Sequence, residues 1–351
     1  MSLRVLLITP EFYGAEKIIK SVLEKSDFEV TWFENRILPL DYHGTNSKLK
    51  LLRKIYFLLL SPHVSYLRKE LKKIDNTKFD ILFSINAHLI CPFLFRKLKS
   101  KNPKLFSVLY LWDSSSMYNW TKELKQFNKV FTFDRADSIK YQIEYKANFY
   151  IKRSINWILE KEYDLFFAGK FSPGRLAVVD KIVKQTEKSG INSFLKLWTA
   201  YKVFLHNHLI YRLLKMFNFK SSWIENYEIN FEAIEGILTR EYIIGKILTY
   251  EEMQHHLSCS NVILDLPFKR QSGYTHRLIE ALANGKKVIT TNSSVRNENF
   301  YNSKQIQVID EQNPEIDCNW IKEKSTYPID NYFLDLELST WLKSIVNVGI
   351  V

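Results

Sequence analysis

The sequence has 351 residues, which is too long for one ordinary hydrophobic core and suits two domains of about 150 residues each. Hydrophobic residues make up 46% and charged residues 25%, a globular composition that excludes a disordered chain. The formal net charge of +12 favours an anionic partner, although lysines that merely keep a surface soluble explain it equally well. No zinc-finger spacing, basic heptad region or aromatic RNA-binding signature points to nucleic acid.

Cysteine usage and hydropathy indicate a cytoplasmic location. Cys91, Cys259 and Cys318 are far apart, and their spacing suits neither a zinc site nor a disulfide framework. The short apolar run at the N-terminus is more typical of a first strand than of a signal peptide. Because no apolar stretch reaches the roughly 18 residues that a membrane-spanning helix needs, none is predicted.

Apolar runs alternate with helical periodicity through the first half of the chain. Strands are predicted within 4–12, 28–34, 78–90 and 104–115 and at the start of 129–141, and helices within 15–26 and at the end of 129–141. Continuous apolar runs such as "VLLI" are typical of parallel strands that are buried on both faces. The alternation therefore predicts an α/β domain with a parallel sheet.

The same alternation restarts near residue 163. It gives a strand and loop in 163–175, a helix in 176–189, a helix and strand in 251–268, a strand in 305–310 and a helix in 332–346, while 235–249 is ambiguous. Two Rossmann-like domains that face a cleft fit this pattern best. We predict a first domain over 1–152, a second over 153–335, and a closing helix over 336–351 that packs back on the first domain.

Two basic segments stand apart from this alternation. Residues 47–73 combine eight Lys and Arg with an apolar face, and residues 195–220, within a predicted insertion at 195–223, contain five Lys and Arg, no acidic residue and many aromatics. Amphipathic basic helices of this kind can lie in the interface of an anionic membrane. Packing of their apolar stripe on their own domain is the alternative. Of the two, 195–220 is the better membrane candidate because its charge has one sign.

The segment 265–295, "DLPFKRQSGYTHRLIEALANGKKVITTNSSV", predicts a strand at 262–266, a turn at 271–275 and a helix at 276–284. The free N–H groups of a helix N-terminus suit phosphate. Gly273 would let a ligand approach the backbone, and Thr275 can cap the helix or bind a phosphate oxygen. Glu280 could accept hydrogen bonds from a ribose, and Gly285 would end the helix. An ordinary strand–turn–helix unit with surface charges is the alternative.

The order of residues in "QSGYTHRLIEALANGKKVITTN" resembles the donor-nucleotide motif of GT-B glycosyltransferases, in particular bacterial enzymes of lipopolysaccharide and capsule synthesis and a related spore-coat group. Two further segments are similar to that group, "YDLFFAGKFSPGR" at the start of the second domain and "YLWDSS … KVFTFDRADSIKY" at the end of the first. Together these segments span most of the chain outside 47–73 and 195–223.

The resemblance implies a nucleotide-sugar donor site in which Glu280 binds the ribose. The phosphates would lie beside Ser272, Gly273, Tyr274 and Thr275, with Arg277 on the same helix and Lys170 and Arg175 adding positive charge at the cleft. Cationic groups that stabilise a leaving phosphate make a metal or other cofactor unnecessary, and Asp265 lacks the partner of an Asp-x-Asp metal motif. Ser272 stands where many retaining enzymes have a second Glu, so retention or inversion is left open.

The catalytic group is expected in the first domain, at strand ends that face the cleft. Asp113 is the leading candidate for a general base or nucleophile, and its alternative is a turn or capping role. Glu11 and His88 occupy equivalent strand ends. Asp134 and Asp137 are interpreted mainly as a helix N-cap region.

The predicted function is transfer of a sugar from a nucleotide-sugar to a growing cell-surface glycan, which is free or lipid-linked, by a cytoplasmic enzyme that can rest on the inner face of the plasma membrane. Another nucleotide-sugar enzyme such as an epimerase, and a non-catalytic partner in glycan assembly, are the alternatives. Donor, acceptor and oligomeric state stay open.

Overall fold

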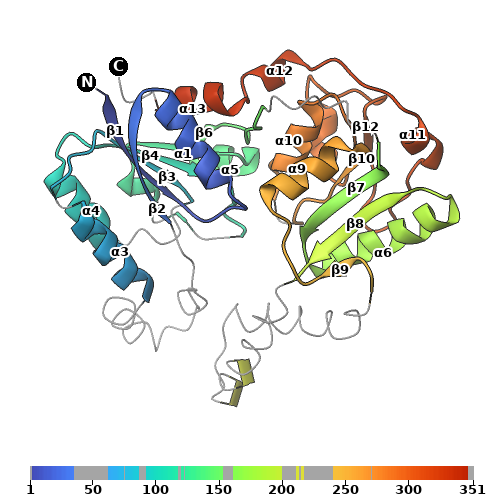
Figure 1. The fold of residues 1–351 in the computed structure, drawn as a ribbon, viewed down its shortest axis with the longest axis horizontal. Helices are drawn as coiled ribbons and strands as arrows, with labels where there is room; N and C mark the ends of the chain where they lie inside the picture. Colours follow the sequence, from blue (N-terminus) through green and yellow to red (C-terminus); the bar gives the residue numbers. More distant parts are fainter. Residues whose placement is uncertain are drawn as a thin grey trace.

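The computed structural model describes residues 2–34, 62–74, 76–86, 92–117, 120–121, 123–152, 161–199, 211–212, 215–216, 240–269 and 271–346. Its strands form two six-stranded sheets in two halves of the molecule that lie side by side (Figure 1). The strands are β1 (Leu3–Thr9), β2 (Phe28–Glu34), β3 (Ile81–Ile85), β4 (Phe106–Leu111), β5 (Lys129–Thr132) and β6 (Glu144–Tyr145), followed by β7 (Tyr163–Lys170), β8 (Ser193–Trp198), β9 (Ile243–Ile244), β10 (Ser260–Asp265), β11 (Lys287–Thr290) and β12 (Ile306–Val308).

Ten α-helices of the described residues connect or cover these strands. They are α1 (Ala15–Lys25), α3 (Pro62–Lys73), α4 (Pro92–Lys101), α5 (Arg135–Tyr141), α6 (Pro173–Lys188), α9 (Tyr250–Ser258), α10 (His276–Leu282), α11 (Cys318–Lys322), α12 (Asn331–Leu334) and α13 (Leu338–Val346). The two parallel-sheet domains predicted from the sequence are confirmed. The boundary near residue 152 stays a prediction, because residues 153–160 lie outside the described part of the chain.

The order of the strands fixes where a ligand can bind. The first sheet runs β2-β1-β3-β4-β5-β6 and the second β12-β11-β10-β7-β8-β9, and all neighbouring strands are parallel. The strand order reverses between β1 and β3 in the first sheet and between β7 and β10 in the second. Open parallel sheets bind ligands at such switch points, outside the carboxyl ends of the strands.

Alternate side chains of the second sheet enter two different cores. Phe166 and Ile263 point to the face covered by α10, whereas Phe167 and Leu264 point to the face covered by α6. Complete burial on both faces explains why the strands appear in the sequence as continuous apolar runs. The first of these cores is continuous with the face of the first sheet that contains Val5, so one hydrophobic core joins both halves.

The segment predicted as a helix from residue 195 begins instead as strand β8, and this part of the prediction is wrong. Leu195 and Leu197 are buried while Lys196 between them is partly exposed, which is the period-two pattern of a strand. Residues 200–210, 213–214 and 217–220 of the segment lie outside the described residues. Of the segment 47–73, residues 62–73 form α3, whose Leu71 is buried in the core of the first half.

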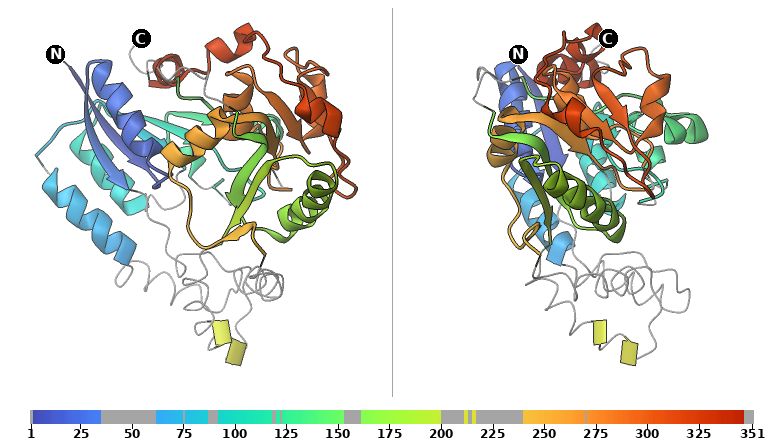
Figure 2. Two further views of the ribbon diagram at one scale, coloured as in Figure 1. Left: turned by 45° about the vertical axis from the view of Figure 1, so that its right-hand side comes forward. Right: turned by 90° about the vertical axis from the view of Figure 1, so that its right-hand side faces the viewer.

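The C-terminal helix α13 packs back on the first half, as Figures 1 and 2 show beside α1. Trp341 of this helix is buried, donates its indole N–H to the carbonyl of Ala147 at 2.8 Å, and contacts the ring of Tyr110 edge-on. Among the described residues, no helix has the length and apolar character needed to cross a membrane.

A tight contact between the halves forms where Gly273 meets Phe133. An ideal Cβ at Gly273 would lie 2.5 Å from the Phe133 ring and 2.7 Å from its carbonyl oxygen, distances that side chains do not adopt. The adjacent Ser272 donates its backbone N–H and its hydroxyl to Asp134, at 2.9 and 2.5 Å. Asp134 also caps α5 by accepting from the backbone of Ala136 and Asp137. The turn before α10 is therefore fastened to the first half.

We expect Gly273→Ala to move the halves apart. The added methyl group has to displace Phe133 or its backbone, which should cost about 1–3 kcal/mol of unfolding free energy. Thermal unfolding and the radius of gyration from X-ray scattering measure the change. Gly245→Ala is the matched control, because nothing lies within 4 Å of an added Cβ there. Equal melting temperatures for the two variants would contradict the tight contact.

Candidate functional site

The candidate site lies at the switch point of the second sheet, where β7 and β10 end and the chain continues toward α6 and α10. Helix α6 begins after Ser172, whose hydroxyl accepts the backbone N–H of Arg175, and α10 begins after Thr275, whose hydroxyl accepts that of Leu278. Each helix carries an arginine in its first turn, Arg175 and Arg277. An ideal Cβ at Gly169 would lie 3.4 Å from the guanidinium groups of both, so the two arginines converge on this glycine.

Arg175 is buried, and no carboxylate among the described residues lies within ion-pair distance of it. Its Nε donates to the carbonyl of Leu266 at 2.8 Å and its terminal nitrogen to that of Lys170 at 3.0 Å. The guanidinium group lies 3.9 Å over the ring of Phe268. Carbonyl dipoles and a ring face hold the group in place but leave its charge uncompensated.

Arg277 shares one carboxylate with two other donors. It donates to the carbonyl of Ala168 at 2.6 Å, and its ion pair with Asp265 is long at 3.4 Å. Asp265 also accepts the hydroxyls of Thr275 at 2.6 Å and Thr290 at 3.0 Å. The Nε of Arg277 is buried and has no hydrogen-bond partner among the described residues. The pair of arginines thus has more donor capacity than the protein satisfies.

Burial and mutual repulsion act on both charges. The pKa of Arg175 is lowered to about 9, first by burial and then by the charge of Arg277, with Asp265 opposing. Burial also lowers the pKa of Arg277. Arginine side chains in proteins stay protonated at neutral pH. A bound anion would relieve the repulsion and occupy the unused donor, so the arginine pair is a candidate anion site.

Lys170 and Tyr13 complete the anion site from opposite halves. Lys170 lies at the exposed end of β7. Desolvation by the surrounding protein lowers its pKa, the charge of Asp113 opposes this, and the charge of Arg175 adds to it. Tyr13, in the loop after β1, has a left-handed backbone with a φ of 56°. Burial raises its pKa, and the charges of Arg277 and Arg175 oppose this rise. The loop of the first half therefore reaches the arginine pair.

Glu280 is buried on α10, one turn beyond Arg277. Its carboxylate accepts the hydroxyl of Tyr250 at 3.0 Å, and the backbone N–H of Tyr250 donates to the carbonyl of Tyr13. Tyr250 thus connects the predicted ribose-binding carboxylate to the loop that covers the arginines. Gly285 has a φ of 66° and ends α10, as its position after the apolar stripe predicted.

The predicted phosphate loop 272–275 makes most of its polar contacts with protein groups. Ser272 donates to Asp134, as described above, while the carbonyl of Tyr274 accepts the amide of Asn148 at 2.8 Å. The buried Tyr274 donates its hydroxyl to Glu298. Phosphate binding by Ser272, Gly273, Tyr274 and Thr275 remains a prediction, and the hydroxyls of Ser272, Tyr274 and Thr275 have protein partners already.

Asp113 lies at the junction of the halves, as expected for a strand end that faces the cleft. It accepts hydrogen bonds from the amides of Asn86 at 2.5 Å and Gln271 at 3.2 Å, one from each half. Glu11 is exposed in the loop after β1, and His88 lies outside the described residues.

The structure adds His276, which the sequence analysis did not single out. Its Nδ1 lies 3.1 Å from the carbonyl of Phe149, and because a carbonyl only accepts, Nδ1 carries the proton. The Nε2 atom is buried and has no hydrogen-bond partner in the described part of the chain. Rings of Phe12, Trp112 and Phe149 surround the imidazole, at centroid distances of 5.5, 5.9 and 4.8 Å. His276 can therefore accept a proton or hydrogen bond at Nε2.

The strand ends predicted from the sequence lie in segments that the structure brings together, but the prediction did not name every side chain there. In the loop after β1 it pointed to Glu11, whereas Tyr13 reaches the arginine pair. Nothing in the local sequence marks His276, the first residue of α10, as a site residue. Its environment is formed by residues of the other half, including Phe149 and Trp112.

Comparison of the structure with solved structures gives the fold. An α,α-trehalose-phosphate synthase (UDP-forming) from Burkholderia xenovorans, in complex with glucose-6-phosphate, has a TM-score of 0.54 and 10% identity, over 99% of this chain and 100% of that one. The N-terminal domain of a trehalose-6-phosphate phosphatase from Candida albicans has a TM-score of 0.52 and 10% identity, over 100% and 97%. A trehalose 6-phosphate synthase from Burkholderia multivorans has a TM-score of 0.51 and 8% identity, over 100% and 97%.

These structures share the GT-B architecture, so the chain has the GT-B fold that the sequence resemblance predicted. At such low identity the similarity concerns the fold. No protein-family model and no curated protein matches the sequence.

We expect His276 to make the protein acid-sensitive. Burial lowers its pKa to about 4, against about 6.5 in the unfolded chain, with the Phe149 carbonyl and Asp113 opposing. The stabilising effect of the neutral imidazole is fully present above pH 6.5 and is lost as the pH falls towards 4. Between pH 7 and 4, the wild type should lose on the order of 2–3 kcal/mol more unfolding free energy than His276→Gln.

Urea unfolding at a series of pH values measures this difference, because all other titrating groups are common to both proteins. Parallel stability curves for wild type and His276→Gln would contradict a buried neutral imidazole.

Proposed function

We propose that the protein is a glycosyltransferase that moves a sugar from a nucleotide-sugar donor to an acceptor hydroxyl. The observation that carries this proposal is the convergence of Arg175 and Arg277 on Gly169, at the switch point of a parallel sheet, where Asp265 pairs with Arg277 alone and at a long distance. A nucleoside diphosphate supplies the negative charge that these groups lack. The GT-B fold agrees with such a donor, since the similar B. xenovorans structure is that of a UDP-forming synthase.

The other residues take roles that fit this donor. Glu280 receives the ribose hydroxyls, with Tyr250 holding its carboxylate. Lys170 and the arginines face the phosphates, and Thr275 fixes the start of α10. Neutralisation of the leaving phosphate by these cations is the reason to propose a metal-independent reaction, because such groups stabilise developing negative charge without a divalent ion.

Asp113 is proposed as the general base. It accepts the proton of the acceptor hydroxyl while that oxygen bonds to the anomeric carbon and the bond from this carbon to the phosphate oxygen breaks. Asn86 and Gln271 keep the carboxylate in place. His276, whose Nε2 has no partner among the residues that the structure describes, lies among aromatic rings beside the same junction and would position the acceptor. Glu11 and His88 remain less direct candidates.

The acceptor proposed from the sequence resemblance is a growing cell-surface glycan such as lipopolysaccharide or capsule, met on the inner face of the membrane. The net charge of +12 and the basic helix α3 support peripheral attachment to an anionic surface. Residues 195–198 belong to β8 and so no longer contribute to a membrane-binding helix.

Arg175→Gln should weaken the binding of nucleoside diphosphates by about 10- to 100-fold, the value of one charge-assisted hydrogen bond, while leaving the binding of the nucleoside unchanged. Titration calorimetry with the uridine, guanosine, thymidine and cytidine series measures both. Arg296→Gln is the control, because this exposed arginine makes a single long contact with a carbonyl. Equal loss in both variants, or no loss in either, would contradict the anion site.

Asp113→Asn should lower turnover at least about 100-fold and leave nucleotide affinity intact, because the amide keeps the shape of the carboxylate but cannot accept the proton. Release of nucleotide from a panel of donor sugars in the presence of acceptor extracts measures turnover. A full-rate Asp113→Asn enzyme would remove the assignment. Donor binding by the wild type without any turnover would instead favour the non-catalytic assembly partner.

A further inference from the structure

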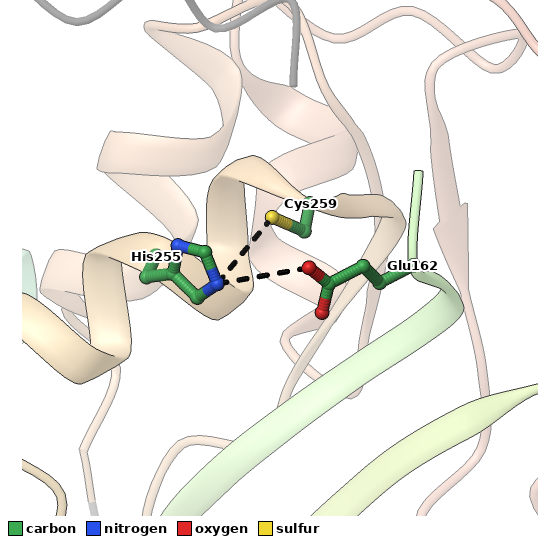
Figure 3. Close-up of side chains that lie close together, drawn as sticks. All are labelled: Glu162, His255 and Cys259. Atoms are coloured by element: carbon green, nitrogen blue, oxygen red, sulfur yellow. Dashed lines mark hydrogen bonds and ion pairs between the residues drawn. The ribbon is translucent and has the colours of Figure 1, made fainter. Parts of the chain in front are cut away.

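A second cluster of polar groups lies at the other end of the second sheet. Glu162 immediately precedes β7, and His255 and Cys259 come from the last turn of α9 and the residue after it. Figure 3 shows the Nε2 of His255 facing both the sulfur of Cys259 and the carboxylate of Glu162, each at 3.8 Å. One ligand atom from each residue lies within 4.8 Å of the other two.

The backbone holds these three residues in place. His255 and Cys259 are four residues apart, the spacing that puts two side chains on one face of a helix and that helical metal motifs use. The N–H of Cys259 donates to the carbonyl of His255 at 3.0 Å, and that of Glu162 to the carbonyl of Cys259 at 2.8 Å. These backbone hydrogen bonds therefore fix the positions from which the three side chains extend.

We propose that Glu162, His255 and Cys259 form a binding site for one divalent cation of the zinc class. In a tetrahedral site, Zn–S and Zn–N bonds of about 2.3 and 2.05 Å place sulfur and nitrogen about 3.5 Å apart. The observed distance between Sγ and Nε2 is 3.8 Å, so a small contraction suffices. His255 and Glu162 have exposed side chains and are free to make this adjustment.

The ligand set selects the metal. Thiolate, imidazole and carboxylate together suit zinc, whereas magnesium and calcium need oxygen ligands alone. Binding replaces the thiol proton of Cys259, which is released to solvent, and the two anionic ligands then balance the charge of the ion. Three protein ligands leave a fourth position for water.

The cluster is separate from the donor site. Glu162 and Lys170 stand at opposite ends of β7, eight positions apart, which corresponds to ~26 Å at a strand rise of about 3.3 Å per residue. A metal there would join the end of α9 to the start of β7, the strand that carries the anion site at its other end. Its effect is on the stability of the second half rather than on the chemistry.

Zinc titration of the metal-free full chain tests the proposal. We expect one equivalent of Zn²⁺ to bind, with release of a proton and a rise in melting temperature. Cobalt should give the absorption bands of tetrahedral thiolate coordination. Glu162→Gln and Cys259→Ser should each weaken zinc binding at least about 100-fold, and Cys259→Ser should also remove the sulfur-to-cobalt band.

Cys318→Ser is the matched control, because its thiol lies on α11 and should leave zinc binding unchanged. Glu162→Gln changes an exposed side chain, so it keeps the test valid if Cys259→Ser does not fold. Lys161→Gln should strengthen binding, since Lys161 interacts electrostatically with Cys259 and repels a cation. Failure of the wild type to retain zinc, or equal retention by Glu162→Gln and Cys259→Ser, would overturn the proposal in favour of a metal-free thiol–imidazole contact.

Discussion

The structure depends on two guanidinium groups that it buries at the carboxyl ends of β7 and β10. Arg175 and Arg277 converge on Gly169, where a side chain would occupy the space between them. Carbonyl dipoles and an aromatic ring hold each arginine, and the carboxylate of Asp265 pairs with Arg277 alone, so only part of the charge is compensated. Because uncompensated buried charge is costly, the same arrangement that lowers stability creates strong attraction for an anion.

The turn before α10 is both a candidate phosphate-binding segment and a contact between the two halves. In a nucleotide-binding unit, the turn between strand and helix offers its N–H groups to phosphate. Here Asp134 of the first half takes the N–H and hydroxyl of Ser272, and Gly273 packs directly on Phe133. A phosphate that uses the Ser272 N–H has to replace a carboxylate, an exchange of one anion for another. Donor binding and the contact between the halves therefore share one segment.

Much of the candidate site could be predicted from strand ends and helix starts. The pattern placed Arg277 and Glu280 in the second half and Asp113 in the first, the family resemblance implied Arg175, and the structure brings these segments to one junction. The sequence pattern missed His276, because nothing in the local sequence distinguishes a buried imidazole from an exposed one. It was wrong about residues 195–198, where leucines alternating with basic and aromatic residues form a strand rather than the start of a basic helix.

By itself, the sequence determined the alternation of buried strands and helices, the parallel sheets and the helix caps at Ser172, Thr275 and Asp134. These features follow from side-chain periodicity and from hydrogen bonds within a few residues. Only the tertiary structure decided which polar side chains meet. The pairing of Asp134 with Ser272 and the approach of Glu162 to Cys259 join residues about 100 or more positions apart. Such contacts depend on strand order and on the packing of two halves around one core, which no local pattern encodes.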